Sequence, residues 1–416
     1  QEVRGGSATV TFNALDPEIL DLLTLKQQRT DPSYRLDHMD YSMSVNHLLL
    51  KKAAKNEQWM TVSPYVASKL WDLSYSGDQI AFEEEYERVL KSPVKKNMVN
   101  ARDIISSWVT ARGDSGRVYI TFLDNVNSHT PFKDPIRLSN LCQEVMLPTS
   151  PYADVSGLYN EKSDGEVALC NLGSIVVSNI EDDKDYEETA YILAKITDNT
   201  IERGIYPFPQ VEHTAKRRRS IGIGMTDLAH LMAKNDLSYD TEEGRNFIHA
   251  LAEKHSYFLH KASVRLAKER GACEWLNKTK YSDGWLPIDT YSKEVDQCHS
   301  EPLHMDWDGL RNDIKSVGVR FSVLESFMPT ESSSLLTNSC NGVYPVRKTE
   351  IFKSSKKGSV YFRAPDFEIF DYQNAYDIHD LDMVKVYSLI QKFSGQGISA
   401  DFYSVVDGTT TKLSLK

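Results

Sequence analysis

The stretch ATVTFNALDPEILDLLTLKQQ, residues 8–28, decides the fold class, because a strand pattern passes directly into a helix pattern. Residues 8–12 are apolar and β-branched, as expected of a short buried strand. Asp16 and Pro17 then supply an N-cap and a first-turn proline, which predict a helix over residues 16–28. This order of elements is typical of an α/β protein.

The same pattern recurs along the chain. Apolar, β-branched runs predict further strands at residues 117–122, 166–172 and 359–364. Amphipathic helices are expected at 80–91, 100–113 and 241–271, and the last should end at Gly271 with an apolar face formed by Phe247, Leu251, Phe258, Leu259, Ala262 and Leu266. No linker or repeat interrupts these elements, which favours one large α/β body over two linked domains.

The composition excludes several classes of protein. The 416 residues are 40% apolar, which suits a globular protein with a sizeable core. A net charge of −11 argues against a protein whose main role is to grip nucleic acid. Five cysteines without a CxxC pair predict a reducing compartment, and no apolar run reaches the ~18 residues of a membrane span. No signal peptide is visible, so the expected location is the cytoplasm.

The segment SNLCQEVMLPTS, residues 139–150, carries the densest group of reactive side chains. Asn140, Cys142 and Glu144 stand at alternate positions, so an extended segment would point all three the same way. An amide, a thiol and a carboxylate on one spot would suit nucleophilic or radical chemistry. The alternative is a structural cysteine buried in a polar loop. A cysteine hydrolase would also need a histidine base, and no histidine has a local signature for that role.

A second candidate segment is FMPTESSSLLTNSCNG, residues 327–342. Its hydroxyl-rich helix start could cradle a phosphate through Pro329, Thr330, Glu331, Ser332 and Ser333. The alternative is a plain capping box with Thr330 or Ser332 as the N-cap.

Two further features have simpler interpretations. Cys170, in EVALCNLGS, is a core cysteine by default. Gly222 and Gly224 do not continue as GxGxxG, so they indicate close backbone packing at a strand-to-helix turn and not a dinucleotide site. The sequence contains no histidine and carboxylate motif with the spacing of metal ligands, so no bound metal is predicted.

Together these segments resemble the large, catalytic subunit of class I ribonucleotide reductase. The similarity covers nearly the whole chain, in the order of the family, and is carried by VRGGSATVTF, HMDYSMSVNHLL, SGRVYITFLDNVNSHTPF, SNLCQEVMLPTSP, GEVALCNLGSI, RRRSIGIGMTDLAHLMA, ERGACEWLNKTKY, LPIDTYSKEVD, EPLHMDWDGL and MPTESSS. Residues 342–367 are most similar to the phage-encoded versions.

The resemblance implies a fold and a set of roles. The fold is a ten-stranded α/β barrel with residues 139–150 as a central finger loop. Cys142 would be the thiyl radical that abstracts the 3′-hydrogen of the ribose, Glu144 the base that takes the 3′-hydroxyl proton, and Asn140 a clamp on the substrate hydroxyls. Cys170 would be one of two thiols that reduce the 2′ position and end as a disulfide. Other implied substrate contacts are Ser139, the diphosphate-binding residues Pro329, Thr330, Glu331, Ser332 and Ser333, and Arg4, at the end of the loop that couples effector identity to base choice.

The resemblance also implies the partners. The chain itself binds no metal or cofactor, because the radical comes from a separate small subunit with a dimetal-tyrosyl centre. ATP and dNTP effectors bind mostly outside this chain. The other expected partners are the ribonucleoside diphosphate, thioredoxin or glutaredoxin, and a second copy of the subunit, with no membrane and no nucleic acid among them.

Three elements of the family are absent from residues 1–416. The cysteine that pairs with Cys170 is expected before Gln1, and the radical-accepting tyrosine pair and C-terminal cysteines after Lys416. We therefore expect an incomplete catalytic barrel domain, from a truncated sequence or one of several complementary split fragments, that folds poorly and is inactive alone. The alternatives are a non-catalytic nucleotide-binding relative and the adenosylcobalamin-dependent class of reductase, which shares NxCxE.

Overall fold

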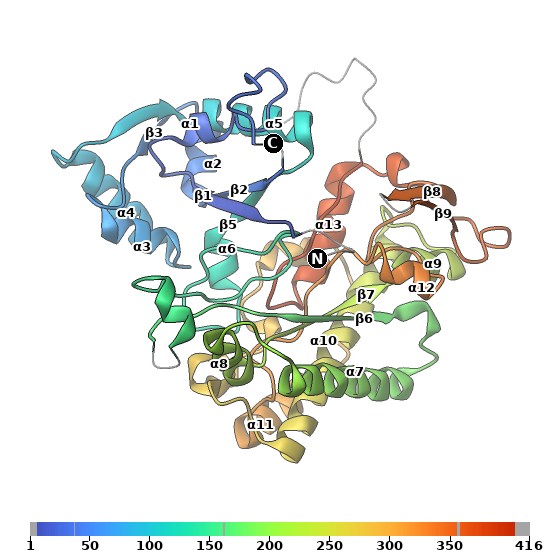
Figure 1. The fold of residues 1–416 in the computed structure, drawn as a ribbon. Coiled ribbons are helices and arrows are strands. Elements are labelled where there is room, and N and C mark those ends of the chain that lie inside the picture. The colour runs from blue at the N-terminus through green and yellow to red at the C-terminus, as the bar shows by residue number, and fades with distance from the viewer. Residues whose placement is uncertain (1–5, 37, 161–162, 356–357, 404–416) are drawn as a thin grey trace. The chain divides into compact units, whose positions relative to one another are not determined.

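The computed structural model describes residues 6–36, 38–160, 163–355 and 358–403 (Figure 1). Helices and strands alternate along the chain, which confirms the mixed α/β content. The chain divides into two compact units, each described here by itself. Unit 1 contains the described residues of Gln1–His129 and Pro135–Pro148, and unit 2 those of Thr130–Asp134 and Thr149–Lys412. The described residues form no closed barrel, so the single ten-stranded barrel stays a prediction.

Unit 1 is built on a parallel sheet of β1 (Thr9–Asn13), β2 (Asp40–Val45) and β5 (Val118–Phe122), in the order β1-β2-β5. The strands predicted at 8–12 and 117–122 are thereby confirmed. β2 was not predicted, because the serines in DYSMSV hide a strand whose last five residues are all buried.

The helix predicted over residues 16–28 is wrong in length, because only α1 (Ile19–Leu22) is helical. The Asp16 carboxylate accepts a hydrogen bond from the Glu18 N–H at 2.8 Å, but this closes a local turn and does not start a long helix. Turns follow, and the side-chain amide of Gln27 donates to the Leu23 carbonyl at 3.1 Å. Local side-chain bonds replace the helical ladder there.

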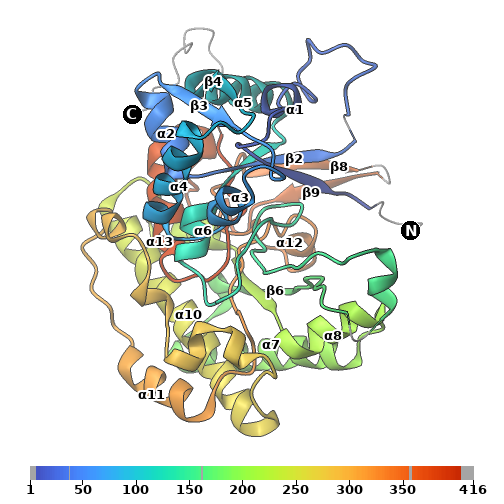
Figure 2. The same ribbon diagram turned by 90° about the vertical axis from the view of Figure 1, so that its left-hand side faces the viewer.

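The rest of unit 1 packs on a core that contains Trp59, Phe82 and Tyr86. The helices predicted at 80–91 and 100–113 are confirmed as α4 and α5, which begin after the N-cap residues Asp78 and Asn100. The view turned by 90° shows the antiparallel pair β3 and β4 beside α5 (Figure 2). The elements are α2 (His47–Ala54), β3 (Gln58–Thr61), α3 (Ser68–Ser74), α4 (Gln79–Lys91), β4 (Asn97–Asn100), α5 (Ala101–Ser115) and α6 (Leu123–Ser128).

Unit 2 contains a parallel array. Strands β6 (Asn171–Val176) and β7 (Ile221–Thr226) pair directly, and residues 323–327 and 397–399 continue the array through the parallel bridges Ile223–Glu325 and Phe327–Ile398. The strand predicted at 166–172 starts later, at Asn171. Glu166 instead pairs with Ser150 in an isolated antiparallel bridge, and its carboxylate is held by the buried guanidinium of Arg218.

The helices of unit 2 pack around this array. The 29-residue helix α10 (Glu242–Arg270) runs alongside α7 (Asp183–Arg203) in both views (Figures 1 and 2). It begins after Thr241, whose hydroxyl accepts from the Gly244 N–H at 3.1 Å, and ends before Gly271, as predicted. Four residues of the predicted apolar face are buried, but Phe247 and Leu251 are only partly buried. The buried side instead includes Ile248 and Ala252.

The remaining elements of unit 2 are a hairpin, further helices and short 3-10 turns. They are α7 (Asp183–Arg203), α8 (Pro209–Arg218), α9 (Leu228–Lys234), α10 (Glu242–Arg270), α11 (Trp307–Val317), α12 (Ser333–Leu336), β8 (Glu350–Ser355), β9 (Gly358–Arg363) and α13 (Asp380–Gln391), with 3-10 turns at Val155–Tyr159, Val177–Asn179, Leu276–Lys278, Lys280–Asp283, Pro287–Asp289, Lys293–Gln297 and Ala375–Asp377. The hairpin strand β9 confirms the strand predicted at 359–364.

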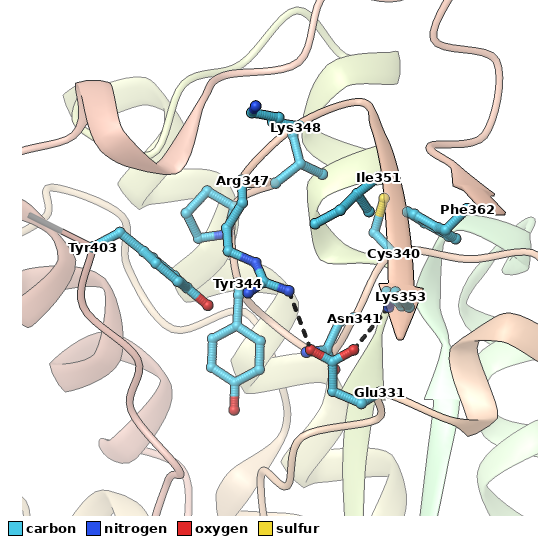
Figure 3. Close-up of a pocket in the computed structure, with 12 residues that line it drawn as sticks. Glu331, Cys340, Asn341, Tyr344, Arg347, Lys348, Ile351, Lys353, Phe362 and Tyr403 are labelled. Carbon is cyan, nitrogen blue, oxygen red and sulfur yellow. Dashed lines mark hydrogen bonds and ion pairs between the residues drawn. The ribbon is translucent and has the colours of Figure 1, made fainter. Parts of the chain in front are cut away.

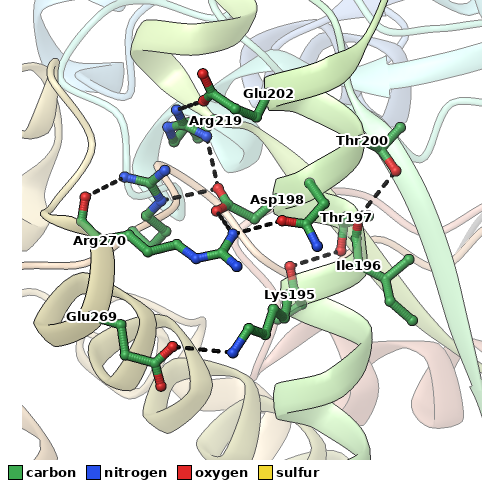
Figure 4. Close-up of polar contacts among 12 residues, drawn as sticks. Lys195, Ile196, Thr197, Asp198, Thr200, Glu202, Arg219, Glu269 and Arg270 are labelled. Atoms are coloured by element: carbon green, nitrogen blue, oxygen red, sulfur yellow. Dashed lines mark hydrogen bonds and ion pairs between the residues drawn. The ribbon is translucent and has the colours of Figure 1, made fainter.

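A buried carboxylate, Asp198 on α7, holds several of these elements together (Figure 4). It binds Arg219 after α8, Arg270 at the end of α10, and Arg320, at N–O distances of 2.7, 2.7 and 2.9 Å. Burial by itself would raise the pKa of Asp198, but the hydrogen bonds from Arg320 and Arg270 and the charge of Arg219 lower this pKa overall. One ionised side chain therefore joins segments that are distant in the sequence.

Candidate active site

The loop that contains Cys142 is fastened to the sheet of unit 1. The side-chain carbonyl of Gln143 accepts hydrogen bonds from Ser42 on β2 at 2.9 Å and from Thr121 on β5 at 3.0 Å. The Thr9 hydroxyl on β1 donates to the Leu141 carbonyl at 3.1 Å. All three strands of the sheet thus hold the loop.

The predicted extended conformation of this loop is wrong. Ser139 and Met146 pair in an antiparallel bridge, and the residues between them turn back on themselves, with Gln143 at a φ of 68°. Asn140 and Glu144 nevertheless meet, because the turn brings them together and their amide and carboxylate bond at 2.8 Å. The half-buried Cys142 lies within the turn that separates them.

The Glu144 carboxyl is 2% exposed. Burial raises its pKa, and the hydrogen bonds from a backbone N–H and from Asn140 only partly oppose this rise. Asn140 also accepts from the Val145 N–H at 3.1 Å, and the Ser139 hydroxyl donates to the Val145 carbonyl at 2.9 Å. The side-chain amide of Asn140 is therefore fixed through both its nitrogen, which donates to Glu144, and its oxygen, which accepts from Val145. The loop thus carries the Cys142 thiol and, two residues further on, a carboxyl group whose pKa is raised.

Tyr119 on β5 is an electrostatic neighbour of the thiol. Burial is the largest cause of its raised pKa, and the charges of Asp40 and Cys142 add to the rise. Sequence reasoning missed both Tyr119 and Gln143. Neither carries a local signal, because their relation to Cys142 depends on strands that are distant in the sequence.

In unit 2, the half-buried Cys170 lies directly before β6 and is tightly packed against β7. A Cβ atom at Gly222 would lie 3.3 Å from the Cys170 sulfur and 2.6 Å from the Ser326 Cβ. At Gly224 it would lie 2.7 Å from the Ser326 carbonyl oxygen. The close backbone packing predicted for these glycines is confirmed, and it leaves room for Cys170, but both glycines lie within β7 and not at a strand-to-helix turn.

The segment predicted to bind phosphate, residues 329–333, follows residues 323–327 of the parallel array. Pro329 is half-buried and Thr330 buried, whereas Glu331, Ser332 and Ser333 are exposed. The capping-box alternative is wrong in its details, because no side chain caps the four-residue helix α12. Since the array is parallel, Cys170 and Pro329 lie at its opposite ends, so the structure does not bring them into contact.

Asn341 is a third residue that sequence reasoning missed. Its side-chain oxygen accepts from the Thr330 N–H at 2.6 Å, and the Thr330 hydroxyl accepts from the Gly342 N–H at 2.7 Å. This clamp fixes the beginning of the phosphate segment. Arg4, the remaining predicted site residue, lies outside the described residues.

Across the described ranges, no helix is both long and apolar enough to pass through a membrane.

Comparison with known proteins identifies the family. The chain matches the model for "Ribonucleotide reductase, barrel domain" over residues 1–369. The ribonucleoside-diphosphate reductase subunit alpha of Haemophilus influenzae is 37% identical over 406 residues, which are 96% of this chain and 53% of the relative. The subunit alpha of Enterobacteria phage T4 is 38% identical over 380 residues, 89% of this chain and 49% of the relative. For Escherichia coli (strain K12) ribonucleoside-diphosphate reductase 1 subunit alpha the identity is 37%, over 96% of this chain and 53% of the relative.

The chain spans about half the length of the curated relatives it matches. The family model covers most of its residues, including the Cys142 loop, Cys170 and the segment that contains Ser332. The chain belongs to the ribonucleotide reductase barrel-domain family.

Proposed function

We propose that this chain is the central catalytic part of a class I ribonucleoside-diphosphate reductase large subunit, which makes 2′-deoxyribonucleoside diphosphates for DNA synthesis. The observation that carries this proposal is the buried Glu144 bonded to Asn140 on the loop of Cys142, in a chain of this family. The raised pKa of Glu144 suits a carboxylate that must accept a proton during the reaction.

In the proposed reaction the Cys142 loop acts on the ribose. Cys142, as a thiyl radical, takes the 3′-hydrogen atom and later returns it, while Glu144 accepts the 3′-hydroxyl proton. Asn140 and Ser139 hold the substrate hydroxyls. The 2′-hydroxyl leaves as water, and the thiols of Cys170 and a second cysteine supply two electrons and two protons and end as a disulfide. Thioredoxin or glutaredoxin then reduces that disulfide by thiol exchange.

The substrate diphosphate is assigned to residues 329–334. The exposed Glu331, Ser332 and Ser333 offer polar groups to a ligand, and the Thr330–Asn341 clamp holds the segment in place. Arg4 is proposed to act with the effector loop at the base.

We also infer that residues 1–416 form part of a ten-stranded barrel domain. The parallel strands within each unit support this arrangement, because a barrel of this kind is assembled from parallel runs. A separate small subunit would supply the radical, and a second large subunit would complete a dimer. The bacterial and phage relatives, and a sequence of five cysteines without a CxxC pair, favour the cytoplasm of a bacterium, including one infected by a phage.

The assay that tests the function offers cytidine diphosphate and a dithiol to the holoenzyme, either with a small radical-generating subunit or with adenosylcobalamin. We expect 2′-deoxycytidine diphosphate only in the first case. Product that requires adenosylcobalamin would instead identify the cobalamin-dependent class. Absence of product in both arms, with nucleotide still bound, would identify a non-catalytic relative.

The double substitution Ser332→Ala with Ser333→Ala should raise the KM for the diphosphate by about 10- to 30-fold, since each lost hydrogen bond is worth roughly 1 kcal/mol. We expect kcat to stay within about twofold, because these hydroxyls lie on the diphosphate segment and not on the Cys142 loop. Initial rates over a range of substrate concentrations measure both constants. Ser316→Ala, at an exposed serine of α11, is the control. An unchanged KM would leave residues 329–334 without a role in substrate binding.

A further inference from the structure

The side chain of Gln143, which lies between Cys142 and Glu144 in the sequence, is enclosed by the sheet of unit 1. Gln143 is 8% exposed, and the residues whose hydroxyl groups face its amide, Ser42 and Thr121, are 0% and 4% exposed. These two hydroxyl groups also lie 3.0 Å from each other. Buried polar groups that bond to one another in this way fix each other's positions. The proposed chemistry gives this polar cluster no role.

Gln143 uses both ends of its side-chain amide. The amide oxygen accepts from the hydroxyl groups of Ser42 and Thr121, and the amide nitrogen donates to the backbone carbonyl of Asn140 at 2.9 Å. The backbone N–H of Gln143 donates to the same carbonyl oxygen at 3.3 Å. Asn140 is therefore attached, through one glutamine side chain, to the strands β2 and β5 of the sheet.

The backbone of Gln143 is strained. Its φ of 68° lies in the left-handed region, which residues other than glycine seldom adopt. A strained residue persists where the surrounding contacts over-determine its conformation, and such residues cluster at functional sites. The three hydrogen bonds of the Gln143 side chain provide contacts of this kind. The turn that carries Cys142 therefore depends on this side chain.

Asn140 passes the attachment on to Glu144. Its side-chain nitrogen donates to the Glu144 carboxylate at 2.8 Å. Burial is the largest influence on the pKa of Glu144 and raises it, whereas hydrogen bonds from its own backbone N–H and from Asn140 lower it. Within the described part of the chain, no charged side chain is among these influences. A shift of the Asn140 side chain would thus change both where the carboxylate lies and how readily it takes up a proton.

Glu331, the other carboxylate among the predicted site residues, is held in a different way (Figure 3). Its oxygens lie 2.8 Å from the Lys353 ammonium and 3.6 Å from the Arg347 guanidinium, and its side chain is 47% exposed. Glu144 is buried and bonded by the neutral amide of Asn140. The attraction between charges falls off slowly with distance, whereas a hydrogen bond weakens steeply when its geometry is disturbed. The state of Glu144 is therefore sensitive to small displacements of Asn140.

We propose that Gln143 is a positioning residue of the reductase site, which holds Asn140 against the sheet so that Asn140 can place the base Glu144. This inference deepens the proposed function and rests on it, because it takes Glu144 as the group that accepts the 3′-hydroxyl proton. Through Gln143, hydroxyl groups on β2 and β5 help to determine where that proton acceptor lies.

The test compares Gln143→Met with the unsubstituted holoenzyme, in kcat and KM for cytidine diphosphate over a range of pH. Methionine is similar in shape to glutamine but has no amide. At the pH optimum kcat should fall by about tenfold or more, because the base is misplaced, while KM stays within about threefold. Weakening the bond from Asn140 raises the pKa of Glu144, and Glu144 must be ionised to accept a proton. The acidic limb of the kcat profile should therefore move to higher pH by about half a unit or more.

The pH profile separates positioning from a purely structural role, because a smaller amount of folded enzyme lowers the rate at every pH and leaves the limb in place. Gln27→Met is the matched control, since Gln27 is a buried glutamine of unit 1 whose side chain donates to the Leu23 and Ser107 carbonyls. It should not move the limb. Gln143→Gly removes the amide and suits a φ of 68°, so it should behave like Gln143→Met.

Thr121→Val tests the attachment to the sheet. It removes one of the two hydroxyl groups that donate to Gln143 and keeps the shape of the side chain, so kcat should fall by about threefold. Combined with Gln143→Met it should cause no further loss, because both substitutions act through the same amide. Losses that multiply in the double variant would overturn the proposal that the sheet acts through Gln143.

A Gln143→Met enzyme whose acidic limb moves no further than that of Gln27→Met would also overturn the inference. Absence of product from the unsubstituted holoenzyme would overturn the proposed function, and this inference with it. The two failures are distinguishable, because in the first the unsubstituted enzyme turns over cytidine diphosphate and in the second it does not.

Discussion

Replacing Cys142 with serine is expected to reduce the turnover of ribonucleoside diphosphate to below about one thousandth of the original rate, with substrate affinity within about twofold. The reason is chemical. An alcohol O–H bond is stronger than a thiol S–H bond, so serine cannot form or regenerate the hydrogen-abstracting radical. The loop should keep its position, because Gln143 and the Leu141 carbonyl hold it to the sheet. The rate of 2′-deoxynucleotide formation by the holoenzyme, together with calorimetric affinity, measures both quantities.

Cys298→Ser is the matched control, since Cys298 is also half-buried but follows the 3-10 turn Lys293–Gln297 in unit 2 and has no assigned role. Its turnover should be close to that of the unsubstituted enzyme. Turnover near the original rate in Cys142→Ser would remove the radical assignment. Loss of nucleotide affinity together with turnover would mean that the substitution had disturbed the fold and not only the chemistry.

Asp198→Asn is expected to lower the free energy of unfolding by about 3–5 kcal/mol, because it leaves three buried or partly buried guanidinium groups without their shared anion. Its effect should depend on pH. The folded-state pKa of Asp198 is lowered, so the stabilisation is present above the unfolded-state pKa of about 3.9 and is lost as pH falls through the folded-state value. The difference between the two proteins should therefore be full at pH 7 and shrink in strong acid. Urea unfolding at several pH values measures it.

Asp183→Asn provides the comparison for a surface pair. Asp183 bonds Lys254 at 2.7 Å, but Asp183 is exposed and Lys254 partly exposed, so we expect a change below about 1 kcal/mol. Similar losses in Asp183→Asn and Asp198→Asn would show that the arginine cluster does not hold the helices together.

Secondary-structure elements were predictable from the sequence where the local residue pattern alone determines the backbone conformation. The runs at 8–12, 117–122 and 359–364 became strands because β-branched residues suit a pleated backbone at any register. The prediction for 16–28 failed because Gln27 and other polar side chains satisfy backbone groups locally, which no periodicity reveals. The strand at 166–172 began late because a distant guanidinium, that of Arg218, fixes Glu166.

In the candidate site, too, locally determined features were predictable and features that depend on distant contacts were not. The identities of Asn140, Cys142 and Glu144 and their membership of one group were readable from the sequence, but their geometry was not. Alternate spacing predicted an extended segment, whereas a positive φ at Gln143 folds the segment into a turn. That turn depends on hydroxyl groups of β2 and β5, about 20 to 100 residues earlier in the chain. Contacts of this separation have no local signature.

The attachment of the Cys142 loop to β1, β2 and β5 gives the thiol a fixed frame of reference. The position of the thiol therefore depends on the spacing of the three strands to which the loop is hydrogen-bonded. A conformational change that shifted those strands relative to one another would therefore also displace the sulfur atom of Cys142. The parallel sheet of unit 1 thus contributes to the placement of the reactive thiol as well as to the stability of the unit.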